Sequence, residues 1–160
     1  MSADSPHALE VAPIPTRCSE IMKQPVRCVR ETDTVQSAAR SMRDADVGFL
    51  PVCYEDGSVA GILTDRDIVT RACAGDGHPS AVIVGDVMTR AVVACRPDEA
   101  IAKASARMRQ HRLTRIVILD ARRTPVGVIS LSDVAQYEHP TKVGRTLQAV
   151  AERKYGPQRP

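Results

Sequence analysis

The chain has 160 residues and a net charge of +3, and its 43% hydrophobic and 26% charged residues are ordinary for one globular domain or for two small repeats that share a core. A net positive charge this small does not indicate the strongly basic surface of a DNA-binding protein. Aromatic residues are scarce, with one phenylalanine and three tyrosines, whereas single-stranded nucleic acid is normally bound by stacking on aromatic rings. Nucleic acid is therefore an unexpected partner, and any bound base is expected to rest on aliphatic side chains.

The beginning of the chain predicts a flexible arm and no targeting segment. Residues 1–16 contain three prolines and show no hydrophobic period, as is typical of a loose N-terminal arm. The first 20 residues lack the apolar stretch of a signal peptide, and no run approaches the ~18 apolar residues of a membrane span. We therefore expect a cytoplasmic protein without a membrane partner.

The five cysteines are odd in number and include no C-x-x-C pair. Because the ligand spacing of zinc sites is missing, we expect reduced, structural thiols and neither a metal site nor disulfides.

An internal repeat organises the rest of the chain. A shift of 66 residues aligns 20–69 with 86–135 without a gap, with identities such as Gly61/Gly127 and Asp67/Asp133. A duplication is the best account of this similarity. The predicted parts are a first repeat at 17–76, a linker at 77–84, a second repeat at 85–138 and a C-terminal helix and tail at 139–160.

Each repeat predicts the same elements in the same order. Apolar residues spaced at i, i+3, i+4 and i+7 from Val35 and from Ile101 predict a long helix in each repeat. Asp33 and Asp98 stand where acidic residues begin such helices. The other expected elements are helical turns at 19–22 and 85–88, strands at 26–29, 49–54, 58–63, 92–95, 115–119 and 125–129, and helices that open at Thr64 and Ser130. The predicted fold class is mixed α/β (α+β), with two tandem β-α-β-β-α repeats in one pseudo-two-fold module.

The tail predicts an amphipathic helix. Its apolar face contains Val143, Leu147, Val150 and Ala151, and we expect this face to pack on the module or on a second subunit. Its basic residues are Lys142, Arg145, Arg153 and Lys154. A basic arm for an acidic partner is the alternative interpretation.

The stretches "GILTDRD" at 61–67 and "GVISLSD" at 127–133 share one pattern. The first interpretation is a capping box, in which the hydroxyl and the carboxylate each take a backbone N–H at the start of a helix. The second is a nucleotide site. There the N–H groups and hydroxyl would face a phosphate, the aspartate would accept hydrogen bonds from a ribose, and the glycine would let the ligand approach the backbone.

These motifs and their context resemble CBS domains, and the pair resembles a Bateman module over about residues 17–138. The segment "HRLTRIVILDARRTPVGVISLSD" is similar to the last CBS repeat of the gamma subunit of the AMP-activated kinase. The resemblance implies two adenosine sites. It assigns Asp133 and Ser130, with Met22, Arg27, Val47 and Gly48, to one site, and Asp67 and Thr64, with Met88, Val93, Leu113 and Thr114, to the other.

The two sites are expected to be unequal. Arg115 aligns with a phosphate-binding arginine of the family, although a solvated charge at a strand edge is the alternative. The first repeat departs from the family with Phe49 at this position, so a phosphate there needs another cation, for which Arg66 is the candidate. We expect the tighter site at Asp133.

The sequence contains no dinucleotide or P-loop motif and no metal or triad spacing, so an enzyme is not expected and no cofactor is required. We expect a regulatory sensor whose effector is AMP, ADP, ATP, NAD, S-adenosylmethionine or a cyclic dinucleotide. The alternatives are an interaction module with empty, degenerate sites and a nucleic-acid regulator that uses the basic tail. The sequence does not name the regulated partner. A homodimer is expected because apolar residues remain for outward helical faces, namely Ile68, Val69, Ala72, Val134, Ala135, Val143, Leu147 and Val150.

Overall fold

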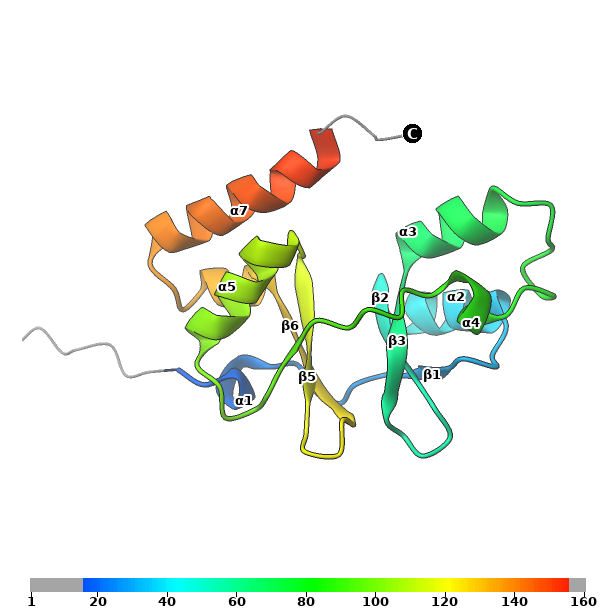
Figure 1. Ribbon diagram of the computed structural model, residues 1–160, viewed down its shortest axis with the longest axis horizontal. Coiled ribbons are helices and arrows are strands. Elements are labelled where there is room, and N and C mark those ends of the chain that lie inside the picture. The colour runs from blue at the N-terminus through cyan, green and yellow to red at the C-terminus, as the bar shows by residue number, and fades with distance from the viewer. Residues whose placement is uncertain (1–15, 156–160) are drawn as a thin grey trace, which may run out of the picture.

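The computed structural model describes residues 16–155 and contains two similar halves of mixed α+β structure, each built on a three-stranded sheet (Figure 1). This confirms the predicted fold class. The rest of the predicted N-terminal arm, residues 1–15, and the end of the tail, residues 156–160, lie outside the described residues.

The elements follow the predicted order in both halves. The first half contains α1 (Cys18–Ile21), β1 (Val29–Arg30), α2 (Val35–Ala45), β2 (Phe49–Cys53), β3 (Val59–Thr64), α3 (Asp65–Asp67) and the π-helical η1 (Ile68–Cys73). The second half contains α4 (Val84–Val87), β4 (Ala94–Cys95), α5 (Ile101–His111), β5 (Arg115–Leu119), β6 (Pro125–Ser130) and α6 (Leu131–Ala135). The tail forms α7 (Pro140–Tyr155).

Both sheets use the same pairing, which places corresponding residues at the same edge. The short first strand runs parallel to the second, and the second pairs antiparallel with the third. Phe49 lies opposite Thr64 in the first sheet, and Arg115 lies opposite Ser130 in the second. The register thus places the last residue of β3 beside the first residue of β2, and the last residue of β6 beside the first residue of β5.

The long helices begin later than the acidic residues suggested. The N-cap of α2 is Thr34, whose hydroxyl accepts from the Ser37 N–H at 3.1 Å, and the N-cap of α5 is Ala100. Asp33 instead accepts from the Arg30 N–H at 2.8 Å, and Asp98 pairs with Arg96 at 3.3 Å. These carboxylates therefore stabilise the turns before the helices.

The helical turn that leads into each half packs in the core of the other half. Cys18 and Ile21 of α1 belong to the core around β4–β6, whereas Val84 and Val87 of α4 belong to the core around β1–β3. A side chain on the glycine at the start of each motif would collide with a methionine from these segments: Met22 lies against Gly127, and Met88 lies against Gly61. The expectation that these glycines open the backbone to a ligand is therefore wrong, because methionine fills the space above them.

The two sheets lie side by side in the middle of the molecule, with the helices outside them (Figure 1). Val59, Val117 and Leu119 form a buried cluster between the halves. The backbone N–H of Val59 also donates to the Arg123 carbonyl at 3.0 Å. The halves therefore share a packed interface that fixes the position of one motif relative to the other.

Helix α7 packs on α5 and α6 with a face that agrees only in part with the prediction, because Val150 is buried and Val143 is half-buried, as expected, but Leu147 and Ala151 are exposed. Thr146 is fully buried and lies 3.3 Å from the Ser105 hydroxyl, whereas the side of the helix that carries Leu147 is exposed. The apolar surface expected for a dimer is smaller than predicted. Four of its residues are buried within the chain, namely Ile68, Ala72, Val134 and Val150. Of its large apolar residues, Val69 and Leu147 remain 61% and 57% exposed.

Within residues 16–155, no helix has the length and apolar character needed to cross a membrane.

Candidate functional site

A cleft of about 560 Å³ lies between the halves, at the end of β3 that carries the first motif. Its volume falls within the range of ordinary small-molecule sites. The first half lines it with Gly48, Phe49, Ile62, Thr64, Asp65, Arg66, Asp67, Thr70 and Arg71. The second half lines it with Thr89, Ala91, Val93, Arg112, Leu113, Thr114, Arg115 and, from α7, Val150.

Both motifs form complete capping boxes. The Asp67 Oδ2 accepts from the Thr64 N–H at 3.0 Å and from the Thr64 hydroxyl at 2.6 Å, and the Thr64 oxygen accepts from the Asp67 N–H at 3.2 Å. Asp133 and Ser130 repeat this geometry at 2.8, 2.5 and 3.2 Å. The prediction that each motif forms a capping box at the start of a helix is therefore confirmed.

The capping box uses only one carboxylate oxygen of each aspartate. In both motifs the cap contacts involve Oδ2, whereas Oδ1 faces cations outside the motif. An ionised carboxylate oxygen has two acceptor positions. A cap and a ribose contact can therefore coexist on the same side chain.

The backbone N–H groups at the start of α3 already have partners within the protein. Asp65 N–H donates to the Gly48 carbonyl at 3.2 Å, and Arg66 N–H donates to the Asp65 carboxylate at 2.7 Å. Together with the Asp67 N–H in the cap, they account for the first turn. The expectation of an open helix N-terminus is therefore wrong, so a phosphate in this cleft must be held by side chains.

Four arginines supply the positive charge of the cleft: Arg66, Arg71, Arg112 and Arg115. Two carboxylates of the lining, Asp65 and Asp67, oppose them, and Arg112 also pairs with Glu152 of α7 at 3.9 Å. Four cations against three carboxylates still leave an excess of positive charge. Sequence reasoning singled out Arg66 and Arg115 but missed the other two. Arg71 lies one helical turn after Asp67, and this i, i+4 spacing was a signal that could have identified it.

Arg71 holds the first motif against the second half of the chain. Its Nη1 donates to the carbonyls of Val87 and Met88 at 2.9 and 3.3 Å and lies 3.6 Å from the Asp67 Oδ1. The guanidinium thus connects the motif carboxylate with the segment that leads into β4.

The apolar part of the cleft combines predicted residues with one aromatic ring. Val93, Leu113 and Thr114 lie there with Thr64 and Asp67, as the assignment of that site placed them. Met88 is buried beneath Gly61 and does not line the cleft. Phe49 also lines the cleft, so this wall offers one aromatic side chain beside the aliphatic ones.

The residues assigned to the Asp133 site are only partly brought together. Met22 packs on Gly127 of β6, the strand that ends at Ser130 and leads into the α6 helix of Asp133, whereas Gly48 lines the Asp67 cleft. Arg27 and Val47 are exposed. Arg115 lies opposite Ser130 in the sheet and also lines the Asp67 cleft.

Asp133 is nearly buried and pairs with a lysine from the other half. Its carboxylate Oδ1 lies 3.2 Å from the Lys23 Nζ, and its side chain is 9% exposed. Burial acts to raise the pKa of Asp133, but hydrogen bonds from Ser130 and the Lys23 ammonium outweigh it, so the pKa is lowered. The carboxylate is therefore held in its ionised form.

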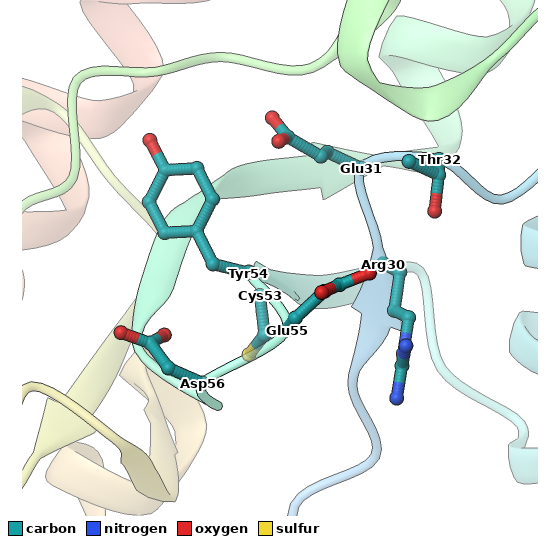
Figure 2. A pocket seen from close by; sticks show the side chains of 7 residues that line it. All are labelled: Arg30, Glu31, Thr32, Cys53, Tyr54, Glu55 and Asp56. Carbon is teal, nitrogen blue, oxygen red and sulfur yellow. The ribbon is translucent and has the colours of Figure 1, made fainter.

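A second hollow of about 420 Å³ lies at the turn between β2 and β3 and has a different character (Figure 2). Three acidic residues, Glu31, Glu55 and Asp56, line it with the single cation Arg30. This charge disfavours phosphate, and no residue of either repeated motif lines the hollow. The Asp67 cleft is therefore the better candidate for an anionic ligand.

Among residues 16–155, no three histidine, cysteine, aspartate or glutamate side chains lie together in a group that could hold a metal ion. All five cysteines are free, and Cys18, Cys53 and Cys95 are buried.

Comparison with known proteins agrees with this architecture. The family model described as the CBS domain matches residues 18–73 and again residues 84–139. The chain belongs to the CBS domain family. It carries a tandem CBS pair, as the resemblance of its motifs implied.

The CBS pair has relatives of similar size. Hypoxic response protein 1 of Mycobacterium tuberculosis is 31% identical over 122 residues, which cover 76% of this chain and 85% of that protein. The CBS domain-containing protein YhcV of Bacillus subtilis is 36% identical over 116 residues, which cover 72% and 81%. A crystal structure of the CBS domain pair of protein MJ0100, in complex with 5′-methylthioadenosine and S-adenosyl-L-methionine, has a TM-score of 0.70 at 23% identity and covers 77% of this chain and 95% of that one. At this identity the likeness concerns the fold.

Proposed function

We propose that this CBS pair is a regulatory module that binds a phosphorylated adenosine nucleotide in the Asp67 cleft without catalysing a reaction on it. The observation that carries the proposal is the presence of a motif carboxylate and four arginines on one cleft of about 560 Å³. The MJ0100 pair, which binds two adenosine compounds, supports the adenosine part of the ligand.

The parts of the ligand match three parts of the cleft. The ribose hydroxyls donate to the Asp67 Oδ1, which the capping box leaves on the outer side of the motif. The base lies against the apolar wall near Phe49, Ile62 and Val93. The phosphates lie between the guanidinium groups, since arginine is suited to planar, bidentate recognition of phosphate.

The charge of the cleft favours AMP, ADP or ATP over the other adenosine compounds. Four arginines against Asp65, Asp67 and the Glu152 that pairs with Arg112 leave a net positive charge, which attracts a phosphate chain and repels the sulfonium cation of S-adenosylmethionine. Adenosine gains no energy from the arginines, and NAD carries less charge for its size than ATP. We expect the affinity to fall from the nucleoside phosphates through NAD to S-adenosylmethionine.

A binding role fits the cleft better than catalysis. The residues that line it include no histidine, cysteine or lysine. Its two carboxylates already accept hydrogen bonds, Asp67 in the capping box and Asp65 from the Arg66 N–H, so neither is poised as a free general base. The ligand instead contacts both halves and Val150 of α7. Occupancy can therefore alter how α7 and the two halves sit together and so change the affinity for a partner protein.

The same geometry reverses the expected order of the two sites. Arg115 lines the Asp67 cleft, whereas the outer oxygen of Asp133 already faces Lys23. We propose that the Asp67 cleft is the tighter site. The five free cysteines support a reducing compartment and hence a cytoplasmic location.

The homodimer also remains part of the proposal, with Val69 and Leu147 as its exposed apolar residues. Light scattering at micromolar concentration should give about twice the 17.3 kDa monomer mass, and Leu147→Glu should lower that mass if α7 lies in the interface. A monomer at every concentration would contradict the dimer and leave the nucleotide site unaffected.

A thermal-shift panel of AMP, ADP, ATP, NAD, adenosine and S-adenosylmethionine tests the proposed function. A ligand at 100 times its dissociation constant stabilises the folded state by about 2.7 kcal/mol. At about 2–4 °C per kcal/mol for a chain of this size, the melting temperature should rise by several degrees with the nucleoside phosphates. A flat response to the whole panel at millimolar concentration would favour an interaction module with empty sites, and salt-sensitive DNA binding would favour a nucleic-acid regulator.

A further inference from the structure

The two capping boxes are alike, but their outer oxygens meet different cations. The Asp133 Oδ1 lies 3.2 Å from the ammonium of Lys23, which comes from the other half of the chain. The Asp67 Oδ1 lies 3.6 Å from Arg71, which comes from the same helical segment and also donates to the carbonyls of Val87 and Met88. Lys23 therefore faces its carboxylate more directly than Arg71 does.

The 66-residue repeat shows what stands at the position of Lys23 in the other half. Lys23 forms an isolated β-bridge with Val128, and Thr89 forms the corresponding bridge with Ile62. Thr89 lines the Asp67 cleft. The same backbone position thus presents a short hydroxyl to the Asp67 cleft and a long ammonium to Asp133.

Two backbone hydrogen bonds fix the position from which the Lys23 side chain extends. Lys23 N–H donates to the Val128 carbonyl at 2.9 Å, and Val128 N–H donates to the Lys23 carbonyl at 3.3 Å. The preceding Met22 packs on Gly127. The capping box occupies the Asp133 Oδ2, so the Oδ1 that faces the ammonium is the oxygen left for an incoming hydroxyl.

We propose that Lys23 is a built-in competitor for Asp133, which occupies the carboxylate oxygen that a ribose would use and so keeps the second site weak. The inference rests on the proposed function, since it concerns the same motif in the other half. A ribose must displace the ammonium from Asp133 before its hydroxyls can donate there. At the Asp67 cleft, Thr89 supplies no ammonium, and the Arg71 guanidinium lies farther from the carboxylate, at 3.6 Å, with the Val87 and Met88 carbonyls as its nearer partners. The weaker competition there favours binding of the first ligand at Asp67.

A reciprocal exchange of the two residues tests this inference, with adenosine as the probe because it lacks a phosphate that lysine could attract. In an Asp67→Ala background, which removes the ribose acceptor of the first site, Lys23→Thr should bind adenosine at least about fivefold more tightly, a factor that corresponds to about 1 kcal/mol. In the otherwise unaltered chain, Thr89→Lys should weaken adenosine binding at the Asp67 cleft by a similar factor. Lys142→Thr, an exposed lysine on α7, is the control and should change neither affinity. Unchanged or weaker adenosine binding after Lys23→Thr would overturn the inference.

A measurement without ligand separates this inference from the proposed function. In a carbon-13 NMR titration, Lys23→Thr should raise the pKa of Asp133, because the lysine acts to lower it; an unchanged pKa would show that Lys23 does not occupy the carboxylate. If the wild-type chain binds nucleotide and Lys23→Thr changes nothing, only the inference fails. If the wild-type chain binds none but Lys23→Thr creates a site, the inference holds and the assignment to the Asp67 cleft fails.

Discussion

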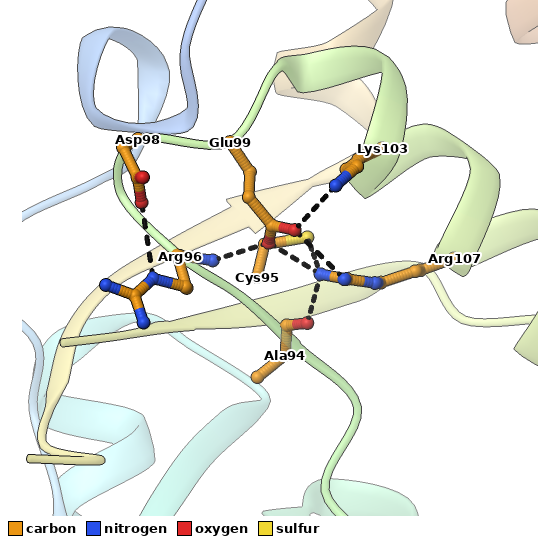
Figure 3. Close-up of polar contacts among 7 residues, drawn as sticks. All are labelled: Ala94, Cys95, Arg96, Asp98, Glu99, Lys103 and Arg107. Atoms are coloured by element: carbon orange, nitrogen blue, oxygen red, sulfur yellow. Dashed lines mark hydrogen bonds and ion pairs between the residues drawn. The ribbon is translucent and has the colours of Figure 1, made fainter. Parts of the chain in front are cut away.

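Arg107 of α5 holds Glu99 through both of its terminal nitrogens, at 2.7 Å from Nη1 to Oε2 and at 3.0 Å from Nη2 to Oε1 (Figure 3). The same Nη1 donates to the Ala94 carbonyl at 2.7 Å and to the Cys95 sulfur at 3.0 Å. The first repeat has Ser41 and Asp33 at the corresponding positions, and a serine is too short for these contacts. The guanidinium thus ties α5 to β4 in the second half.

The loss of this bidentate contact should destabilise the chain. Hydrogen bonds to a charged group contribute about 1.5–3 kcal/mol, so Arg107→Ala should lower the free energy of unfolding in urea by that amount. Lys103→Ala is the control, because Lys103 also pairs with Glu99 but is 65% exposed, and it should cost less than about 1 kcal/mol. Equal losses for the two variants would show that the bidentate geometry adds nothing.

The same contact gives the stability a pH dependence of known sign. The Arg107 hydrogen bond lowers the pKa of Glu99 from 4.5 to about 2. Because the folded-state pKa is the lower one, this contribution is complete above pH 4.5 and is lost as the pH falls towards 2. The stability difference between the wild type and Arg107→Ala should therefore shrink on acidification, and a constant difference would contradict this origin.

Arg115 should read the phosphate of the ligand. Removal of a hydrogen bond to a charged group costs about 1.5–3 kcal/mol, so Arg115→Ala should weaken AMP and ATP binding by roughly tenfold to a hundredfold. Adenosine binding should be nearly unchanged, and Arg122→Ala, an exposed arginine in the β5–β6 turn, should change neither. If adenosine and ATP lose affinity equally, Arg115 supports the fold and does not bind the phosphate.

The two motif aspartates form a matched pair for separating the cap from the ligand. Asp67→Ala and Asp133→Ala each remove one capping box, and each should cost about 1 kcal/mol of stability. Only Asp67→Ala should abolish high-affinity ATP binding, because only Asp67 lines the cleft with the arginines. Calorimetry and urea unfolding on the same preparations measure both effects. Loss of ATP binding in Asp133→Ala alone would restore the order of sites that the sequence suggested.

The duplication and the motif pattern predict the fold well, because both depend on hydrophobic periods and local capping that a sequence displays directly. The positions of Asp67, Thr64, Leu113 and Thr114 on one cleft follow from the resemblance and agree with the structure. Arg71, Arg112 and Lys23 were missed, since their importance depends on which segments meet across the two halves. The role of Gly61 and Gly127 was misjudged for the same reason, because the methionines that pack on them come from distant parts of the chain.

The contact between Met22 and Gly127 should appear as a coupling energy. Gly127→Ala places a methyl group in the space of the Met22 side chain, and such overpacking costs typically about 1–3 kcal/mol. Because Met22→Ala removes two of the three nearest atoms, Sδ and Cγ, and keeps only Cβ, the double variant should be more stable than the sum of the two single losses by at least about 0.5 kcal/mol. Strict additivity would mean that the glycine serves another purpose.

The most direct test of the central claim is a titration of the ¹⁵N-labelled chain with ATP, followed by the backbone amide resonances. Saturable shifts are expected at Thr64, Asp67, Leu113, Thr114 and Arg115, with an apparent affinity that Asp67→Ala abolishes. At the same ATP concentrations the resonances of Lys23 and Asp133 should move little. Shifts confined to the Asp133 motif or to the basic residues of α7, or no shifts at all, would contradict a phosphorylated nucleotide in the Asp67 cleft.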